Sequence, residues 1–397
     1  MKRLYEKNSY ITECVTTVTA CEERADGIYI MLEDTIFFPE EGGQYADTGF
    51  ITYNDIRVDV LDGRLLTNAT TDVNMIISYK VSDTIPVGTQ VTCHLDWEKR
   101  FSRMQNHSGE HILTGLIHNK FGFDNVGFHL SDDGPVTLNI NGILSLEQVL
   151  DIEKAANRVI YDNLAITDSY PTKEELVDIT YRSKIDIAGQ VRLITVGGND
   201  NIIDVCACCA PHVSRTGEIG IIKVISVINY KGGVQIAMLA GSRALEYINH
   251  IQQTLQTVAG SLTTHPDNIM SVINSNRSEL ADCKEKLNRL IEEKYVDIAN
   301  QISPDDIHCI FCDDELSSAN MKNIYNALTA KFPGFVGIFV GNDEIGYRYN
   351  AGSSDLDSTI LGTALKELGA KGGGNSDMIQ GRIATSEEQI VQLFQTI

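Results

Sequence analysis

Two short motifs, far apart in the chain, constrain how it can fold. The first, HSGEH, places His107 and His111 four residues apart in a segment with helical apolar spacing. On a helix, positions i and i+4 lie on the same face, so the two imidazoles can converge on one ion. The second, CCAPH, gives Cys208 and His212 the same spacing, and Pro211 predicts a turn there rather than a continuing helix.

Together the motifs offer three imidazole nitrogens and one thiolate sulfur, which Zn²⁺ accepts in tetrahedral geometry. We therefore expect one zinc ion per chain, bound by these four side chains. Cys206 and Cys209 lie within two residues of Cys208, so spacing alone leaves open which cysteine is the ligand. The nine cysteines are irregularly spaced, which is typical of reduced thiols rather than of a disulfide framework.

The apolar periodicity predicts an α+β multidomain protein with four parts. In residues 1–92 apolar and polar positions alternate as in short strands separated by turns, which is typical of a small β-barrel. Residues 93–242 form an α+β core around a helix that starts near Asp96. Residues 243–302 are helical with heptad-like spacing, as in a linker or a dimerisation arm. Residues 303–397 read as a compact α/β domain, whose sequence KGGGNSDMIQG predicts a glycine-rich loop.

The formal net charge of -22 argues against a general electrostatic attraction for nucleic acid, so any RNA contact needs local cations. Arg100 and Arg103 flank the helix of the first motif. Lys371 opens the glycine-rich loop, where the backbone N–H groups of Gly372 and Gly373 suit phosphates. The sequence has neither an apolar run long enough to span a membrane nor a signal-peptide stretch, so we expect a cytoplasmic protein.

Several stretches, in order along the chain, resemble one family. H-x-x-x-H followed by C-x-x-x-H is similar to the editing domain of alanyl-tRNA synthetases and of the free-standing AlaX-type proteins. FFPEEGGQYADTG, residues 37–49, resembles the glycine-rich motif of the family's amino-terminal barrel, and HVSRTGEIG continues the second motif in a register that favours Cys208 as the ligand. KGGGNSDMIQG is similar to the signature of a carboxy-terminal RNA-binding domain. The resemblance is to the long AlaX form over nearly the whole chain, without the aminoacylation domain of a synthetase.

The resemblance implies a trans-editing hydrolase that deacylates mischarged alanine tRNA, with Ser-tRNA(Ala) and also Gly-tRNA(Ala) as expected substrates. Such an ester needs a positioned water and stabilisation of the oxyanion. A pocket that hydrogen-bonds the serine hydroxyl can reject alanine by about 10⁴–10⁵. Candidate hydrogen-bond partners for the serine hydroxyl are Gln44, Thr48 and Ser108. The alternative is that these side chains only stabilise a turn or lie on the surface of a helix. Gly42 and Gly43 either let the backbone approach the substrate or only form a turn.

Two rival functions remain open. H-x-x-E-H also occurs in zinc hydrolases in which the Glu is the base, so Glu110 suggests a zinc peptidase or esterase, unless this side chain faces solvent. A non-catalytic tRNA-binding module with structural zinc is the other alternative. The helical segment 243–302 can form a homodimer or hold the two ends of the chain apart.

Overall fold

The computed structural model describes residues 1–66, 76–130, 132–183, 190–198, 201–303, 306, 308–312 and 315–397. By internal contacts the chain divides into two compact units, Met1–Thr254 and Leu255–Ile397, each described by itself below. The predicted α+β multidomain organisation is confirmed. The predicted domain boundaries, the last of them between residues 302 and 303, stay predictions. Among the helices described, none is both long and apolar enough to cross a membrane.

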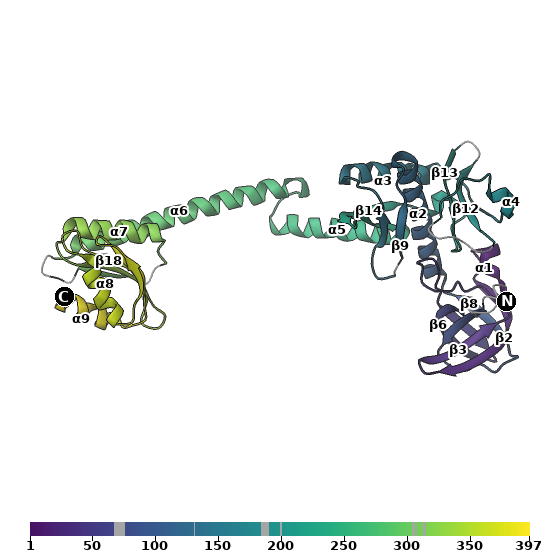
Figure 1. Ribbon diagram of the computed structural model, residues 1–397, viewed down its shortest axis with the longest axis horizontal. Helices are drawn as coiled ribbons and strands as arrows, with labels where there is room; N and C mark the ends of the chain where they lie inside the picture. The colour runs from purple at the N-terminus through teal and green to yellow at the C-terminus, as the bar shows by residue number, and fades with distance from the viewer. Residues whose placement is uncertain are drawn as a thin grey trace. The chain divides into compact units, whose positions relative to one another are not determined.

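The first unit begins with the small β-barrel that the sequence predicts. Its six strands close in the order β2-β3-β7-β6-β5-β8 (Figure 1). Their bounds are Glu13–Arg24, Gly27–Leu32, Ile76–Val81, Ile56–Leu66, Gly49–Tyr53 and Gln90–Leu95, respectively. Every second residue points inward, so that Ile30, Ile51 and Val58 are fully buried in the barrel core. The short strands β1 (Lys2–Arg3) and β4 (Asp34–Thr35) pair beside it, next to α1 (Leu4–Lys7).

Helix α2, Trp97–Phe121, follows the barrel and is the central element of the first unit. It starts where Asp96 accepts a hydrogen bond from Lys99 N and ends at Gly122, whose φ of 71° is left-handed. Most of its middle is buried, including polar and charged side chains. Buried polar groups need partners, so this stretch of the helix concentrates hydrogen bonds and ion pairs.

Two antiparallel sheets pack around α2. One has the order β14-β15-β10-β9 and the other β11-β12-β13. Their strands are β14 Ile222–Tyr230, β15 Gly233–Ala240, β10 Val136–Ile140, β9 Asn125–His129, β11 Ile166–Ser169, β12 Leu193–Gly198 and β13 Asn201–Ala207. The remaining helices are α3 Leu146–Tyr161, α4 Lys173–Leu176 and the 3-10 turn η1 Thr216–Ile219. Met104, Ile112 and Leu113 of α2 share one core with these elements.

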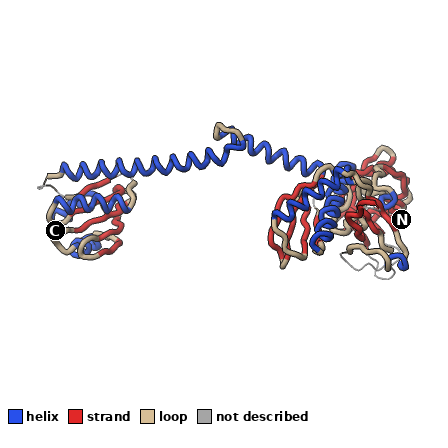
Figure 2. The backbone as a smooth tube through the Cα atoms, turned by 90° about the horizontal axis from the view of Figure 1, so that it is seen from above, coloured by secondary structure: helices blue, strands red, loops and turns tan. Residues whose placement is uncertain are grey.

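The helical segment consists of α5 (Gly241–Ser261), the turn η2 (Pro266–Asn268) and the long helix α6 (Ile269–Gln301). In the second unit a five-stranded sheet has the order β16-β17-β18-β20-β19. Figure 2 shows the strands in red and the helices in blue. These strands are Cys309–Cys312, Val336–Asn342, Gly346–Gly352, Ile379–Ile383 and Lys371–Gly374. Helices α6 and α7 (Ser318–Lys331) pack on one face, and α8 (Ser358–Glu367) and α9 (Glu387–Thr396) pack on the other.

The glycine-rich stretch at Lys371 differs from its prediction. It is not a loop: residues 371–374 form the edge strand β19, antiparallel to β20. A side chain at Gly372 would place its Cβ 2.2 Å from the carbonyl oxygen of Gln380. The glycines therefore allow a close strand pairing that a bulkier residue would prevent, and they leave one backbone edge of β19 unpaired within the described sheet.

Candidate metal centre

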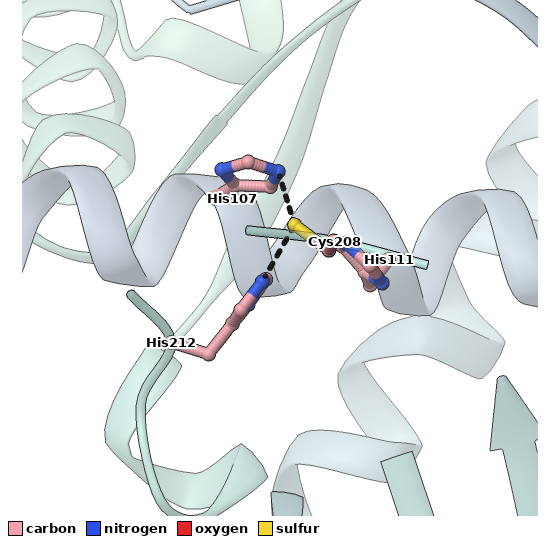
Figure 3. A group of neighbouring side chains, drawn as sticks. All are labelled: His107, His111, Cys208 and His212. Carbon is pink, nitrogen blue, oxygen red and sulfur yellow. Dashed lines mark hydrogen bonds between the residues drawn. The ribbon is translucent and has the colours of Figure 1, made fainter. Parts of the chain in front are cut away.

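The four motif side chains converge, as Figure 3 shows. One ligand atom from each of His107, His111, Cys208 and His212 lies within 4.8 Å of the others. The Cys208 sulfur is 3.3 Å from Nε2 of His212 and 3.6 Å from Nε2 of His107. The two α2 histidines are one turn apart, and the other two residues lie in the irregular segment after β13 that Pro211 predicts.

Each of the three imidazoles has its Nδ1 atom bound by a different side chain. The partners are Gln44 Oε1 for His107 at 2.8 Å, Asp204 Oδ2 for His111 at 3.0 Å and Ser108 Oγ for His212 at 2.9 Å. A carboxylate and a carbonyl oxygen only accept, so the first two Nδ1 atoms carry the proton. The Nε2 lone pairs are thus left for a metal, as in protein sites whose ligand histidines are oriented by such contacts.

Asp204 is itself held in place. Arg182 donates from Nε to Oδ1 at 2.7 Å and from Nη2 to Oδ2 at 2.8 Å. Burial raises the pKa of Asp204, but the hydrogen bonds from His111 and Arg182 outweigh burial and hold the pKa below its usual range. A fixed negative charge therefore lies behind His111, and it strengthens this imidazole as a donor to a cation.

The electrostatics of Cys208 and His212 match the protonation states that metal ligands need. Burial raises the pKa of the Cys208 thiol, but the charges of His107 and His212 and the hydrogen bonds from His107 and His111 together outweigh burial, so the pKa lies well below its ordinary value. Burial lowers the pKa of His212 to about 3. A thiolate beside neutral imidazole is the form that binds a metal, and nitrogen with sulfur donors suits zinc.

The other cysteines of the motif are arranged differently. Cys206 forms a second possible group with His111 and Asp204, but these two side chains already bond each other. Cys209 packs against the barrel core, 3.4 Å from where a Cβ of Gly42 would lie. Of the three candidates, Cys208 alone lies among all three histidines in the part of the chain that the structure describes.

The glycines of the barrel motif form a tight turn. Glu41 and Gln44 exchange backbone hydrogen bonds, and the two residues between them have φ values of 62° and 82°. Positive φ at both central positions is the type I′ arrangement, which favours glycine. A Cβ on Gly43 would lie 2.7 Å from the carbonyl oxygen of Phe128, so the turn also packs closely on β9. The turn places the Gln44 side chain beside His107. The buried Nε2 atom of Gln44 has no hydrogen-bond partner among the described atoms.

Other candidates from the sequence have different surroundings. Thr48 does not contact the four ligands: it donates to Asp96, the N-cap of α2, at 3.5 Å. The alternative that Glu110 faces solvent is excluded, because its buried carboxylate accepts from Asn125 at 2.6 Å. Its Oε2 lies 3.8 Å from Nε2 of His111.

The expected basic patch beside α2 is also wrong. Arg100 is fully buried and pairs with Asp47, while Arg103 is buried and donates to Asp132 at 2.6 Å. Arg103 also donates to the carbonyl oxygen of Ala46 at 2.6 Å, so both guanidinium groups hold the barrel loop against the helix and offer no exposed charge there. Asp204 was not predicted as a functional residue, although D-x-C-x-C in a strand places alternate residues on one face.

Comparisons with known proteins find similarity to tRNA synthetases and alanyl-tRNA editing proteins. Residues 191–235 match the family described as threonyl and alanyl tRNA synthetase second additional domain. The chain is 25% identical to the alanyl-tRNA editing protein AlaX-L of Pyrococcus horikoshii, over 98% of this chain and 96% of that protein. It is 28% identical to the alanyl-tRNA editing protein Aarsd1-B of Xenopus laevis, over 66% of this chain and 64% of that one. It is also 28% identical to an alanine–tRNA ligase of Caldivirga maquilingensis, of which it spans 40%.

Proposed function

Because the chain is a homologue of the AlaX-L alanyl-tRNA editing protein and is related to alanyl-tRNA synthetase, we propose that it deacylates mischarged alanine tRNA in the cytoplasm. The observation that carries the proposal is the convergence of His107, His111, Cys208 and His212. We propose that they hold one zinc ion. When bound, zinc would polarise the ester carbonyl or order the terminal adenosine.

The residues around the ligands suggest how the substrate is recognised. Gln44 uses Oε1 to accept from His107, while its buried Nε2 has two N–H donors without a partner among the described atoms. An unsatisfied buried donor costs about 1–3 kcal/mol, which a hydroxyl of the substrate would relieve. We propose that Gln44 donates to the serine hydroxyl, so that the alanyl ester, which lacks it, is spared.

Ser108 and Thr48 fit other roles. Ser108 Oγ shares a hydrogen bond with His212 Nδ1 and accepts, at 3.3 Å, from the backbone N–H of Val213. It therefore positions a ligand and the ligand-bearing segment, and we assign substrate contact to Gln44 in preference. Thr48 supports the N-cap of α2. Gly42 and Gly43 act through the turn that brings Gln44 to His107.

We propose that the tRNA body contacts the second unit. Arg348, Arg382 and Lys371 stand directly opposite one another on β18, β20 and β19. They line an open groove of about 930 Å³, which also contains Glu315. Like charges in register destabilise a sheet unless an anion compensates them. None of the three pairs with a carboxylate among the described residues, so a phosphate backbone is a suitable partner.

Release of labelled amino acid from alanine tRNA charged with Ser, Gly or Ala tests the function. We expect wild type to release serine and spare alanine, and Cys208→Ala to lose both bound zinc and activity. Gln44→Glu keeps the acceptor for His107 but removes both donors, so it should retain zinc and lose at least about tenfold in serine release. No release from any of the three substrates by folded, zinc-loaded protein would refute the proposal.

The peptidase or esterase alternative is tested in the same assay. Glu110 is bonded to Asn125 and Thr114 and is buried, which explains it as a structural group. Glu110→Gln preserves an acceptor for Asn125. Editing predicts that this variant keeps most of its activity, whereas a Glu general base predicts loss by about 10²-fold or more.

A further inference from the structure

Two thiols outside the candidate metal centre lie opposite each other on neighbouring strands of the barrel. Cys14 on β2 is in register with Cys93 on β8. Leu95 N donates to Thr12 O at 2.8 Å, two residues along the same antiparallel ladder. Since pairs alternate in such a ladder, Cys14 and Cys93 also form a hydrogen-bonded pair, in which the Cα atoms are about 5.5 Å apart. A disulfide spans Cα separations of roughly 4.4–6.8 Å.

The side chains share one environment. Residues directly opposite on antiparallel strands point to the same face, here the barrel interior. Cys93 is fully buried, and the half-buried Cys14 packs against the same core. Hydrogen bonding to Cys93 lowers the pKa of Cys14, although burial opposes it, and the same bond together with burial raises the pKa of Cys93. Cys14, the more accessible of the two thiols, is thus also the more nucleophilic one.

From this register and contact we infer that Cys14 and Cys93 form a reversible disulfide, which makes the barrel a site of thiol oxidation. The oxidant is a low-molecular-weight disulfide. The Cys14 thiolate attacks one of its sulfurs, which forms a mixed disulfide and releases one small thiol. Cys93 then attacks the Cys14 sulfur, its proton passes to the departing second small thiol, and the protein disulfide forms. Two protein thiols are oxidised, and one small disulfide is reduced to two thiols.

The position of the pair links it to the rest of the first unit. Strand β8 ends at Leu95, and the next residue, Asp96, is the N-cap of α2. The covalent link would therefore fasten β2 to the strand that leads directly into the helix carrying His107 and His111. This inference does not depend on the proposed function, because it concerns thiols outside the metal centre.

Peptide mapping of the full-length, zinc-loaded chain after treatment with glutathione disulfide tests the inference. Tryptic peptides 8–24 and 81–99 should appear joined. Because peptide 8–24 contains both Cys14 and Cys21, Cys21→Ser is the matched control: its partner in the ladder is Ile30, and it should leave the link intact. Cys14→Ser and Cys93→Ser should both abolish the link, and Cys93→Ser should leave a mixed disulfide on Cys14.

Cys283 is exposed on α6 and reports whether the oxidant has acted. If Cys283 acquires the small thiol while Cys14 and Cys93 remain free, the inference is overturned. A link that disappears in Cys21→Ser would overturn it as well, since the bond would then involve the wrong residue of β2.

Discussion

Asp204 Oδ2 lies 3.0 Å from Nδ1 of His111, and the same carboxylate is bound by Arg182 through both of its oxygens. All three groups are largely buried, with the side chain of Asp204 only 2% exposed. Asp204 and Arg182 therefore fix the ring orientation and the tautomer of a candidate metal ligand. Groups of this kind commonly determine how tightly a metal is held.

We predict that Asp204→Asn weakens zinc binding by about 10–100-fold. Asparagine keeps one acceptor for His111 but removes the negative charge and leaves Arg182 without its second oxygen. Competition with a chromophoric zinc chelator measures the affinity. Asp168→Asn is a suitable control, because Asp168 also neighbours an arginine, Arg192 at 3.7 Å, but lies at the surface on β11. Equal affinities for the two variants would refute this role of Asp204.

The ion pair between Arg100 and Asp47 leads to a prediction about the stability of the fold. Arg100 is 0% exposed and also donates to the carbonyl oxygens of Ile36 at 2.7 Å and Ser9 at 3.1 Å. Arg100→Met leaves a buried carboxylate and two carbonyls without their donor, which should lower the free energy of unfolding by about 3–5 kcal/mol. Urea denaturation measures it. The exposed pair Arg57–Asp59 supplies the control, since Arg57→Met should change stability by less than about 1 kcal/mol.

Two of the candidate metal ligands could be placed together from the sequence, because helical periodicity is local. Two histidines four apart share a helix face wherever the helix packs, so His107 and His111 needed no tertiary information. The barrel and the strand-rich core followed from alternation in the same way. The bounds of helix α2 could also be predicted, from the helical spacing of its apolar residues.

The partners of these residues were not predictable, because they come from distant segments. Arg100 is separated from Asp47 by 53 positions, and nothing local distinguishes a buried arginine from one that binds RNA. Gln44 was proposed from sequence as a substrate contact, but its carbonyl bond to His107 depends on how the barrel packs on α2. The strand β19 was predicted as a loop because glycine signals a turn locally, whereas strand pairing is set by β20.

The glycine turn of the barrel yields a prediction with an internal control. Gly43→Ala forces a positive φ of 82° on alanine and drives its Cβ to 2.7 Å from Phe128 O. Gly88 has a similar φ of 85° but open space around it. Gly88→Ala should therefore cost about 1 kcal/mol, from backbone strain alone, and Gly43→Ala should cost more. Only Gly43→Ala should reduce serine release, because it displaces Gln44; equal effects on stability and activity would contradict this.

The last prediction concerns the metal-free protein below neutral pH. The pKa of His212 is about 3 in the folded chain, because burial disfavours its charge, and about 6.5 when unfolded. Between about pH 3 and pH 6.5 the unfolded state binds one more proton than the folded state does. The contribution of neutral His212 to the free energy of unfolding is therefore complete above about pH 6.5 and is lost as the pH falls. The free energy of unfolding then changes by up to about 1.4 kcal/mol per pH unit. We expect His212→Asn to flatten the decline in unfolding free energy between pH 7 and pH 5, as measured by urea denaturation of chelator-treated protein. The exposed His265 provides the control, and His265→Asn should follow wild type. Parallel curves for wild type and His212→Asn would show that His212 titrates normally in the folded chain.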